Sequence, residues 1–110
     1  MSYQKIESIA EFNSLLKQSE SGTVVIFKHS STCDLSANAK DEMLKVNLPV
    51  FELVVQTARP LSNHIESHFG IRHESPQVIL IHQGKPFFNA SHRAVTAKNI
   101  QEAAYSAIAP

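Results

Sequence analysis

Cys33 and Ser36 are the residues whose types and spacing most directly suggest chemistry. Cys33 is the only cysteine, and it stands in the segment FKHSSTCDLSANA, residues 27–39. A thiolate attacks disulfides, and free N–H groups at a helix start can lower a cysteine pKa from about 8.5 to roughly 3.5–7.5. Helical spacing of apolar residues begins at Leu35, so Cys33 is expected at or just before a helix start. We predict a reactive nucleophile; a buried, inert cysteine is the alternative, which the polar neighbours disfavour.

Three neighbours are expected to tune the Cys33 thiolate. Lys28 and His29 precede the cysteine segment and could add positive charge, which favours the charged form of the sulfur. Asp34 follows Cys33 directly, opposes the thiolate and competes for the same helix N–H groups. The sequence alone does not show whether these three residues together favour or oppose the Cys33 thiolate.

Ser36 stands where a Cys-x-x-Cys enzyme has its second thiol. That second thiol attacks the mixed disulfide made by the first, and a hydroxyl cannot do so under mild conditions because its pKa is far higher. Cys33 should therefore stop at a mixed disulfide, which a second small thiol must release. Ser36 could also donate a hydrogen bond to the helix or to the sulfur, and the two roles are compatible.

Length and composition exclude several classes of protein. The chain has 110 residues, 43% of them hydrophobic, and we predict a single domain over residues 1–110. Ten Lys plus Arg balance ten Asp plus Glu, so the clustered basic charge that nucleic acids and anionic membranes attract is not expected. The longest apolar runs are four residues, against about 20 for a membrane span, and the first residues show no signal-peptide core. We expect a cytoplasmic protein with no nucleic-acid and no membrane partner.

Helices and strands alternate along the predicted chain. Ser8 and Glu11 form a capping box for the first helix. Gly70 is expected to end the third helix, and Thr96 to cap the fourth. The residues expected to face inward are Ile9, Phe12, Leu15 and Leu16 in the first helix, Leu35, Ala39, Met43 and Val46 in the second, Leu61, Ile65 and Phe69 in the third, and Ile100, Ala103, Ala104, Ala107 and Ile108 in the fourth.

The predicted strands are short and mostly apolar, as buried strands are. They cover residues 23–28, 49–55, 76–82 and 87–91, with a marginal strand at 3–6 and a turn at 83–86. The resulting order, β-α-β-α-β-α-β-β-α, predicts an α/β fold with a mixed central sheet and helices on both faces.

This order resembles the thioredoxin fold over nearly the whole chain. Two features carry the resemblance: a buried strand that leads into a cysteine at a helix start, and the segment FGIRHESPQVILIHQGK, residues 69–85. The second is similar to the thioredoxin-family stretch in which a helix ends at Tyr/Phe-Gly-Ile, a loop reaches a Ser/Thr-Pro pair, and an apolar strand ends in a Gly turn.

Within that superfamily the chain resembles the YtxJ-like monothiol bacilliredoxins. The matching residues are Phe27, Lys28, His29, Ser30, Cys33, Ser36, Ala37, Asn38 and Ala39. The resemblance implies thiol–disulfide exchange on proteins that carry bacillithiol as a mixed disulfide. Bacillithiol would be a co-substrate, no cofactor would be bound, and a separate NADPH-dependent flavin reductase would recycle the bacillithiol disulfide. Asp34 departs from the family, since close relatives are expected to carry proline there.

The resemblance also assigns a role to Ser75 and Pro76. In the thioredoxin fold the matching proline is cis and packs beside the nucleophile, so the preceding residue exposes its backbone to an extended substrate. Carried over, Ser75 would pair with substrate main chain by strand addition. Without the resemblance, Pro76 is equally consistent with an ordinary proline at the start of a strand.

Three other functions were weighed from the residues. His64 and His68, with His73 nearby in sequence, have a spacing that a metal could use, but no further ligand completes a recognisable pattern, and we predict no metal site. Cluster binding, as in monothiol glutaredoxins, is disfavoured because Asp34 and Leu35 stand where those proteins carry Gly-Phe. A thioredoxin-fold binding or adaptor module without redox activity is the main alternative, and Asp34 is its clue.

Overall fold

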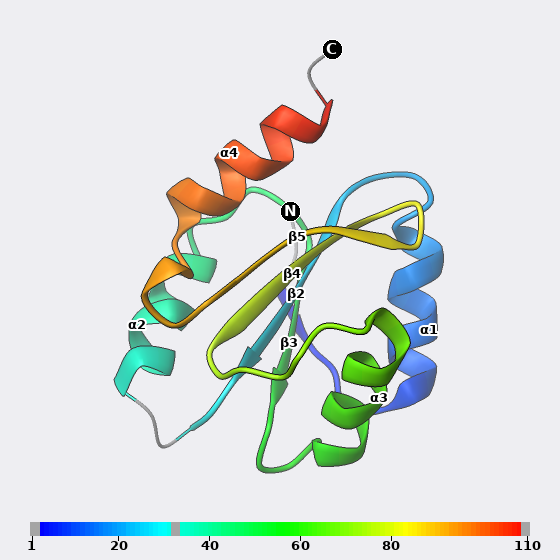
Figure 1. Ribbon diagram of the computed structural model, residues 1–110, viewed down its shortest axis with the longest axis vertical. Coiled ribbons are helices and arrows are strands. Elements are labelled where there is room, and N and C mark those ends of the chain that lie inside the picture. Colours follow the sequence, from blue (N-terminus) through cyan, green and yellow to red (C-terminus); the bar gives the residue numbers. More distant parts are fainter. Residues whose placement is uncertain (1–2, 32–33, 109–110) are drawn as a thin grey trace.

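The computed structural model describes residues 3–31 and 34–108. Within these residues the chain forms five strands, four α-helices and one short 3-10 helix (Figure 1). In chain order the elements are β1 (Tyr3–Lys5), α1 (Ile9–Gln18), β2 (Val24–His29), α2 (Asp34–Met43), β3 (Val50–Val54), α3 (Arg59–Phe69), β4 (Gln77–His82), β5 (Lys85–Ser91), η1 (His92–Ala94) and α4 (Ala97–Ile108). The predicted order of elements is confirmed.

The strands form one mixed sheet in the order β1-β3-β2-β4-β5. β1, β3 and β2 run parallel, whereas β4 is antiparallel to β2 and β5 is antiparallel to β4. β2 therefore lies at the centre of the sheet, and all six of its residues are buried. The predicted mixed sheet of the thioredoxin fold is confirmed.

Each face of the sheet carries its own apolar cluster. Phe12 and Leu15 of α1 and Leu61 and Ile65 of α3 pack with sheet residues on one face. Met43 of α2 and Ile100 of α4 belong to the cluster on the other face. Figure 1 shows the same division, with α1 and α3 on one side of the strands and α2 and α4 on the other. Because helices cover both faces of the sheet, every residue of β2 is buried.

The predicted helix ends are largely confirmed. Ser8 and Glu11 form the capping box of α1, and Gly70 ends α3 in the left-handed conformation, with a φ of 68°. Thr96 Oγ1 accepts a hydrogen bond from the Asn99 N–H at 3.1 Å and so caps α4. Leu35, Ala107 and Ile108 have side chains outside those that the structure describes.

Three details of the prediction were wrong. Ile9 is 42% exposed, because helical spacing gives a side chain's direction but not whether a neighbour covers the helix end. The second helix stops at Met43, although Val46 beyond it is still buried. The hairpin turn consists of Gln83 and Gly84, whose φ values of 53° and 76° suit a two-residue turn, so β5 begins earlier than predicted, at Lys85.

None of the helices within the described ranges has both the length and the apolar character that crossing a bilayer demands.

Leu15 and Ile9 offer a matched test of the core within one helix. Leu15→Ala removes a fully buried side chain and should lower the free energy of unfolding by about 2–5 kcal/mol. Ile9→Ala removes a half-exposed side chain and should change it by less than about 1 kcal/mol. Urea unfolding of both variants measures the difference; equal losses would contradict the packing of α1 described above.

Candidate functional site

The predicted nucleophile, Cys33, and the side chain of Asp34 lie outside the described residues, and their roles stay predictions. The structure does describe the frame on either side of them. β2 ends at His29, and α2 begins at Asp34, directly after Cys33 in the sequence. The residues that hold these two ends together therefore define the candidate site.

Ser36 joins the end of β2 to α2. Its side chain is fully buried, and its Oγ accepts a hydrogen bond from the Ser30 N–H at 3.0 Å. The hydroxyl is thus an acceptor for the loop backbone, a contact that the sequence had not indicated. Because Ser36 is three residues from Cys33, this bond fixes the first turn of the helix against the start of the loop.

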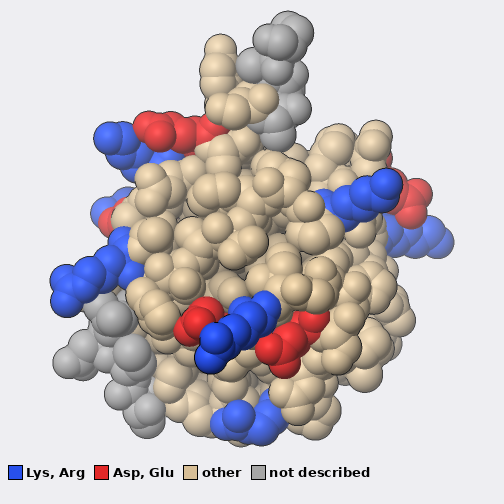
Figure 2. Space-filling view, viewed as in Figure 1, with Lys and Arg blue, Asp and Glu red and all other residues tan. Residues whose placement is uncertain are grey.

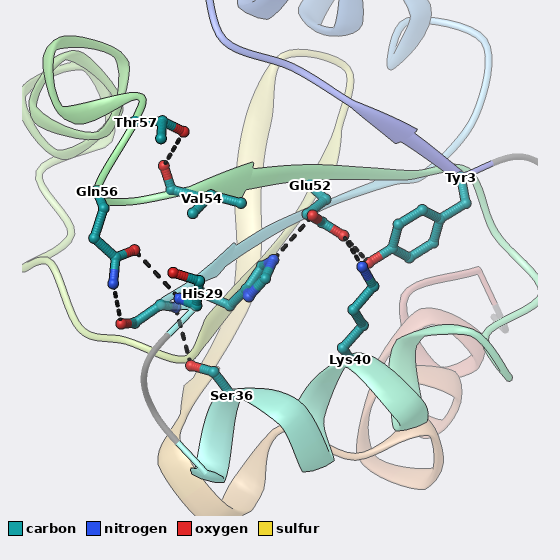
Figure 3. A network of polar contacts seen from close by, with 10 residues as sticks. Tyr3, His29, Ser36, Lys40, Glu52, Val54, Gln56 and Thr57 are labelled. Carbon is teal, nitrogen blue, oxygen red and sulfur yellow. Dashed lines mark hydrogen bonds and ion pairs between the residues drawn. The ribbon is translucent and has the colours of Figure 1, made fainter.

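Gln56, just after β3, holds the same loop from the other side. Its side-chain oxygen accepts a hydrogen bond from the Ser31 N–H at 3.2 Å, and its amide nitrogen donates to Ser30 Oγ at 2.6 Å (Figure 3). The Val55 N–H also donates to the His29 carbonyl at 2.9 Å. Residues 30 and 31 are therefore tied to both β3 and α2.

Glu52, in the middle of β3, is a buried carboxylate at the centre of a polar network (Figure 3). Only 4% of the residue is exposed. Its Oε2 lies 2.9 Å from His29 Nε2. Its Oε1 accepts a hydrogen bond from the Tyr3 hydroxyl and lies 3.5 Å from Lys40 Nζ. β1, β2 and α2 thus each supply a partner.

These partners keep Glu52 ionised. Burial by itself raises the pKa of this carboxyl, but the contacts with His29 and Tyr3 and the charge of Lys40 outweigh it and lower the pKa to about 2. The pKa of Tyr3 is raised, first by burial and then by its bond to Glu52, so the phenol keeps its proton. The His29 ring is further fixed by stacking on Phe27, with ring centroids 4.9 Å apart.

Glu52 was missed by the sequence reasoning, although a signal was present. It is the only charged residue in the apolar run PVFELVV, which was predicted to be a buried strand. A charge at such a position must find partners, since an unpaired buried charge is strongly unfavourable. Gln56 had no comparable signal, because a polar residue after a strand is ordinary.

Lys28 and His29 lie on opposite faces of the sheet, as neighbours in a strand do. Lys28 is fully buried on the α3 side, where its Nζ donates to the Ser62 carbonyl at 3.2 Å and lies 3.4 Å from His73 Nδ1. Burial lowers the pKa of Lys28 to about 8, although the Glu66 carboxylate acts in the opposite direction. His29, which was also predicted to favour the Cys33 thiolate, instead faces Glu52 on the α2 side of the sheet.

The Ser75–Pro76 peptide bond is cis, as the resemblance to the thioredoxin fold implies. Gln77, the next residue, pairs with Lys28, so Pro76 lies at the end of the sheet where the chain leaves β2. Ser75 Oγ is buried and has no hydrogen-bond partner among the described residues. Two of the predicted site segments, the end of β2 and the Ser75–Pro76 pair, are therefore brought to one end of the sheet.

The three histidines weighed as metal ligands do not come together. His64 and His68 both pack edge-on against Phe12, whereas His73 lies 3.3 Å from Ser62 Oγ, beside Lys28. Across residues 3–31 and 34–108, no three His, Cys, Asp or Glu side chains are grouped as metal ligands would be.

The model of the family described as monothiol bacilliredoxin BrxC matches residues 4–100. The chain belongs to this family. The match includes every residue of the site described above except Tyr3, which lies just before it, and it also includes Cys33.

Solved structures support the same fold. A protein described as a candidate oxidoreductase with a thioredoxin fold is 30% identical, with a TM-score of 0.86, and the alignment covers 92% of each chain. Thioredoxin from Fasciola hepatica is 11% identical with a TM-score of 0.77, covering 94% of this chain and 97% of that one. Thioredoxin from Schistosoma mansoni is 14% identical with a TM-score of 0.74, covering 97% and 96%. Family and fold together support a redox function based on thiol–disulfide exchange.

Glu52→Gln tests the buried charge. Lowering a carboxyl pKa from 4.5 to about 2 corresponds to roughly 3 kcal/mol of stability, which is present above about pH 4.5 and lost as the pH falls toward about 2. The variant should therefore be less stable than the wild type near neutral pH, and more than half of this difference should disappear by about pH 3. Urea unfolding as a function of pH measures it. A difference that stays constant over this range would show that Glu52 is not ionised as described.

Proposed function

We propose that this protein is a monothiol bacilliredoxin that removes bacillithiol from protein mixed disulfides through Cys33. The family match over residues 4–100 is the observation that carries the proposal. The buried Ser36, whose hydroxyl is engaged by the Ser30 N–H, supports the monothiol form of the reaction. A hydroxyl so placed cannot act as the resolving thiol.

The proposed cycle has two exchange steps. The Cys33 thiolate attacks the bacillithiol sulfur of the mixed disulfide, a bond forms between these two sulfurs, and the target protein leaves as a thiolate. A free bacillithiol thiolate then attacks the bacillithiol sulfur on Cys33, which releases the Cys33 thiolate and forms bacillithiol disulfide. Both steps conserve electrons, since each forms one S–S bond and breaks one. A separate NADPH-dependent flavin reductase would then reduce the bacillithiol disulfide.

The described residues would support this cycle by positioning. Ser36 and Gln56 hold residues 30 and 31, and the start of α2 offers the positive end of the helix dipole to a thiolate directly before it. Asp34 opposes that effect by its charge. Ser75, at the cis bond, would present its backbone to an extended segment of the target protein.

The chemistry also implies a setting for the protein. A lone cysteine that must return to the thiolate after each turnover needs a reducing compartment, and we place the protein in the cytoplasm. Its partners would be bacillithiolated proteins and free bacillithiol, with no bound cofactor.

Cys33→Ser is the direct test of this function. Reduced wild type mixed with a bacillithiolated target protein should gain the mass of one bacillithiol while the target loses it. The variant should do neither, because it lacks the attacking sulfur. Intact-protein mass spectrometry follows both partners at once. If the wild type stays unmodified and the target keeps its adduct, the alternative of a redox-inactive adaptor module takes its place.

Ser36→Cys separately tests whether Cys33 stops at a mixed disulfide because residue 36 is a serine. The wild type should keep its bacillithiol adduct until free bacillithiol is added, because a serine cannot expel it. The variant should release the adduct unaided and end as an internal disulfide, two hydrogens lighter than its reduced form. Ser36→Ala, which also removes the acceptor of the Ser30 N–H, is the control and should hold the adduct as the wild type does. Spontaneous release from the wild type would contradict the proposed role of Ser36.

A further inference from the structure

A polar pocket lies between α2 and η1, outside the site described so far. Its volume is about 430 Å³, within the range of small-molecule sites. α2 contributes Asn38 and Asp41 to its lining, Lys45 lies in the turn just after α2, and η1 contributes His92 and Arg93. α2 and η1 pack against each other and appear side by side in Figure 1.

The pocket is connected to both halves of the candidate site. Asn38 lies in the second turn of α2, about 6 Å of helix rise from Asp34, the residue that follows Cys33. On the other side, the His92 N–H donates to the Pro76 carbonyl at 2.9 Å. The His92 ring lies 3.3 Å from the Glu74 carboxylate. The η1 wall is therefore fixed to the segment that holds the cis bond.

Some of the pocket's polar groups are already used to build its walls. Glu42, also in the lining, accepts a hydrogen bond from the Ala97 N–H at 3.0 Å and from Lys45 Nζ at 2.8 Å. The Arg93 guanidinium and the Asn38 amide have no hydrogen bond or ion pair with any other described residue. The pocket thus offers an unengaged cation and an unengaged amide on opposite walls.

The mixed charge of the lining favours a ligand that itself carries both charges. The pocket holds the carboxylates of Asp41 and Glu42 beside the cations of Lys45 and Arg93, so a purely anionic or purely cationic molecule would meet repulsion. On the face seen in Figure 2 the charged side chains of both signs are likewise interspersed. A guanidinium is well suited to a carboxylate because it can form two parallel hydrogen bonds.

We propose that this pocket binds the non-sulfur part of bacillithiol, both as the free thiol and as the mixed disulfide; this rests on the function proposed above. Bacillithiol is a zwitterion, with carboxylates on its malate unit, an ammonium on its cysteine and hydroxyls on its sugar. Arg93 binds a malate carboxylate, Asn38 hydrogen-bonds to the sugar or to a carboxylate, and Asp41 attracts the ammonium. Arg93 is the specificity-determining residue, since its side chain has no structural partner to lose.

Arg93→Gln tests the pocket without the redox step. S-methyl bacillithiol cannot exchange, so its binding to the reduced wild type, measured by calorimetry, reports the pocket alone. The variant should bind it about tenfold more weakly, the usual effect of losing one charged hydrogen-bonding partner. Arg59→Gln is the matched control, since Arg59 is also exposed but begins α3 on the opposite face of the sheet, and it should bind as the wild type does.

A spectroscopic readout distinguishes direct contact from a general loss of charge. In NMR titrations of the wild type, the side-chain amide signals of Asn38 should shift on addition of S-methyl bacillithiol, and those of Gln18, outside the pocket, should not. Three results would each contradict the proposal that this pocket binds bacillithiol: no binding of S-methyl bacillithiol to the wild type, equal affinity of the wild type and Arg93→Gln, or an Asn38 signal that does not shift.

The outcomes separate this inference from the proposed function. If the wild type removes bacillithiol from a target protein while Arg93→Gln binds S-methyl bacillithiol as tightly as the wild type, the function stands and the pocket assignment fails. If binding depends on Arg93 but no bacillithiol leaves the target, the pocket stands and the exchange function fails.

Discussion

The buried charge of Glu52 is the interaction on which the candidate site depends. An ionised carboxylate inside a sheet is stable only when its partners compensate for the lost water, and here three partners come from three different elements. Tyr3 connects β1 to Glu52, His29 connects the end of β2 to it, and Lys40 connects α2, the helix that follows Cys33 in the sequence (Figure 3). Removing the charge would therefore weaken the contacts of β3 with β1, β2 and α2 together.

Lys28 repeats this arrangement on the other face with the opposite sign. Its ammonium is buried against Ser62 and His73 on the α3 side, one residue before His29 turns toward Glu52. The end of β2 thus directs one buried polar group to each layer of helices. Apolar residues before this point hold the sheet between its helices, whereas polar contacts from here on fix the direction in which the chain leaves it.

The fold could be predicted from the sequence because its signals are local. The capping box at Ser8 and the Gly70 stop mark helix ends, and the run VVIF marks a buried strand; each depends on neighbours close in sequence. The site could be predicted only in part. The cis bond at Pro76 followed from the resemblance to the thioredoxin fold. The partners of Glu52 meet only through the pairing of the strands and the packing of α2, and the bond from Ser30 to Ser36 depends on how α2 is placed against the end of β2. The exposure of Ile9 has the same origin, because apolar periodicity does not show which residues of a helix face other elements will cover.

Ser36 connects the local structure with the need for a binding pocket. A second thiol at this position would complete the reaction within the chain, so the enzyme would need no affinity for the small thiol that it releases. With a hydroxyl there, which accepts a hydrogen bond from the Ser30 N–H, the proposed cycle takes its second step from a free thiol. Thiol chemistry alone discriminates little among small thiols of similar pKa, because exchange rates follow the pKa of the attacking thiol. In the proposed cycle, selection among them must therefore come from contacts with the rest of the molecule, and the walls of α2 and η1 are close enough to Asp34 and Pro76 to supply those contacts.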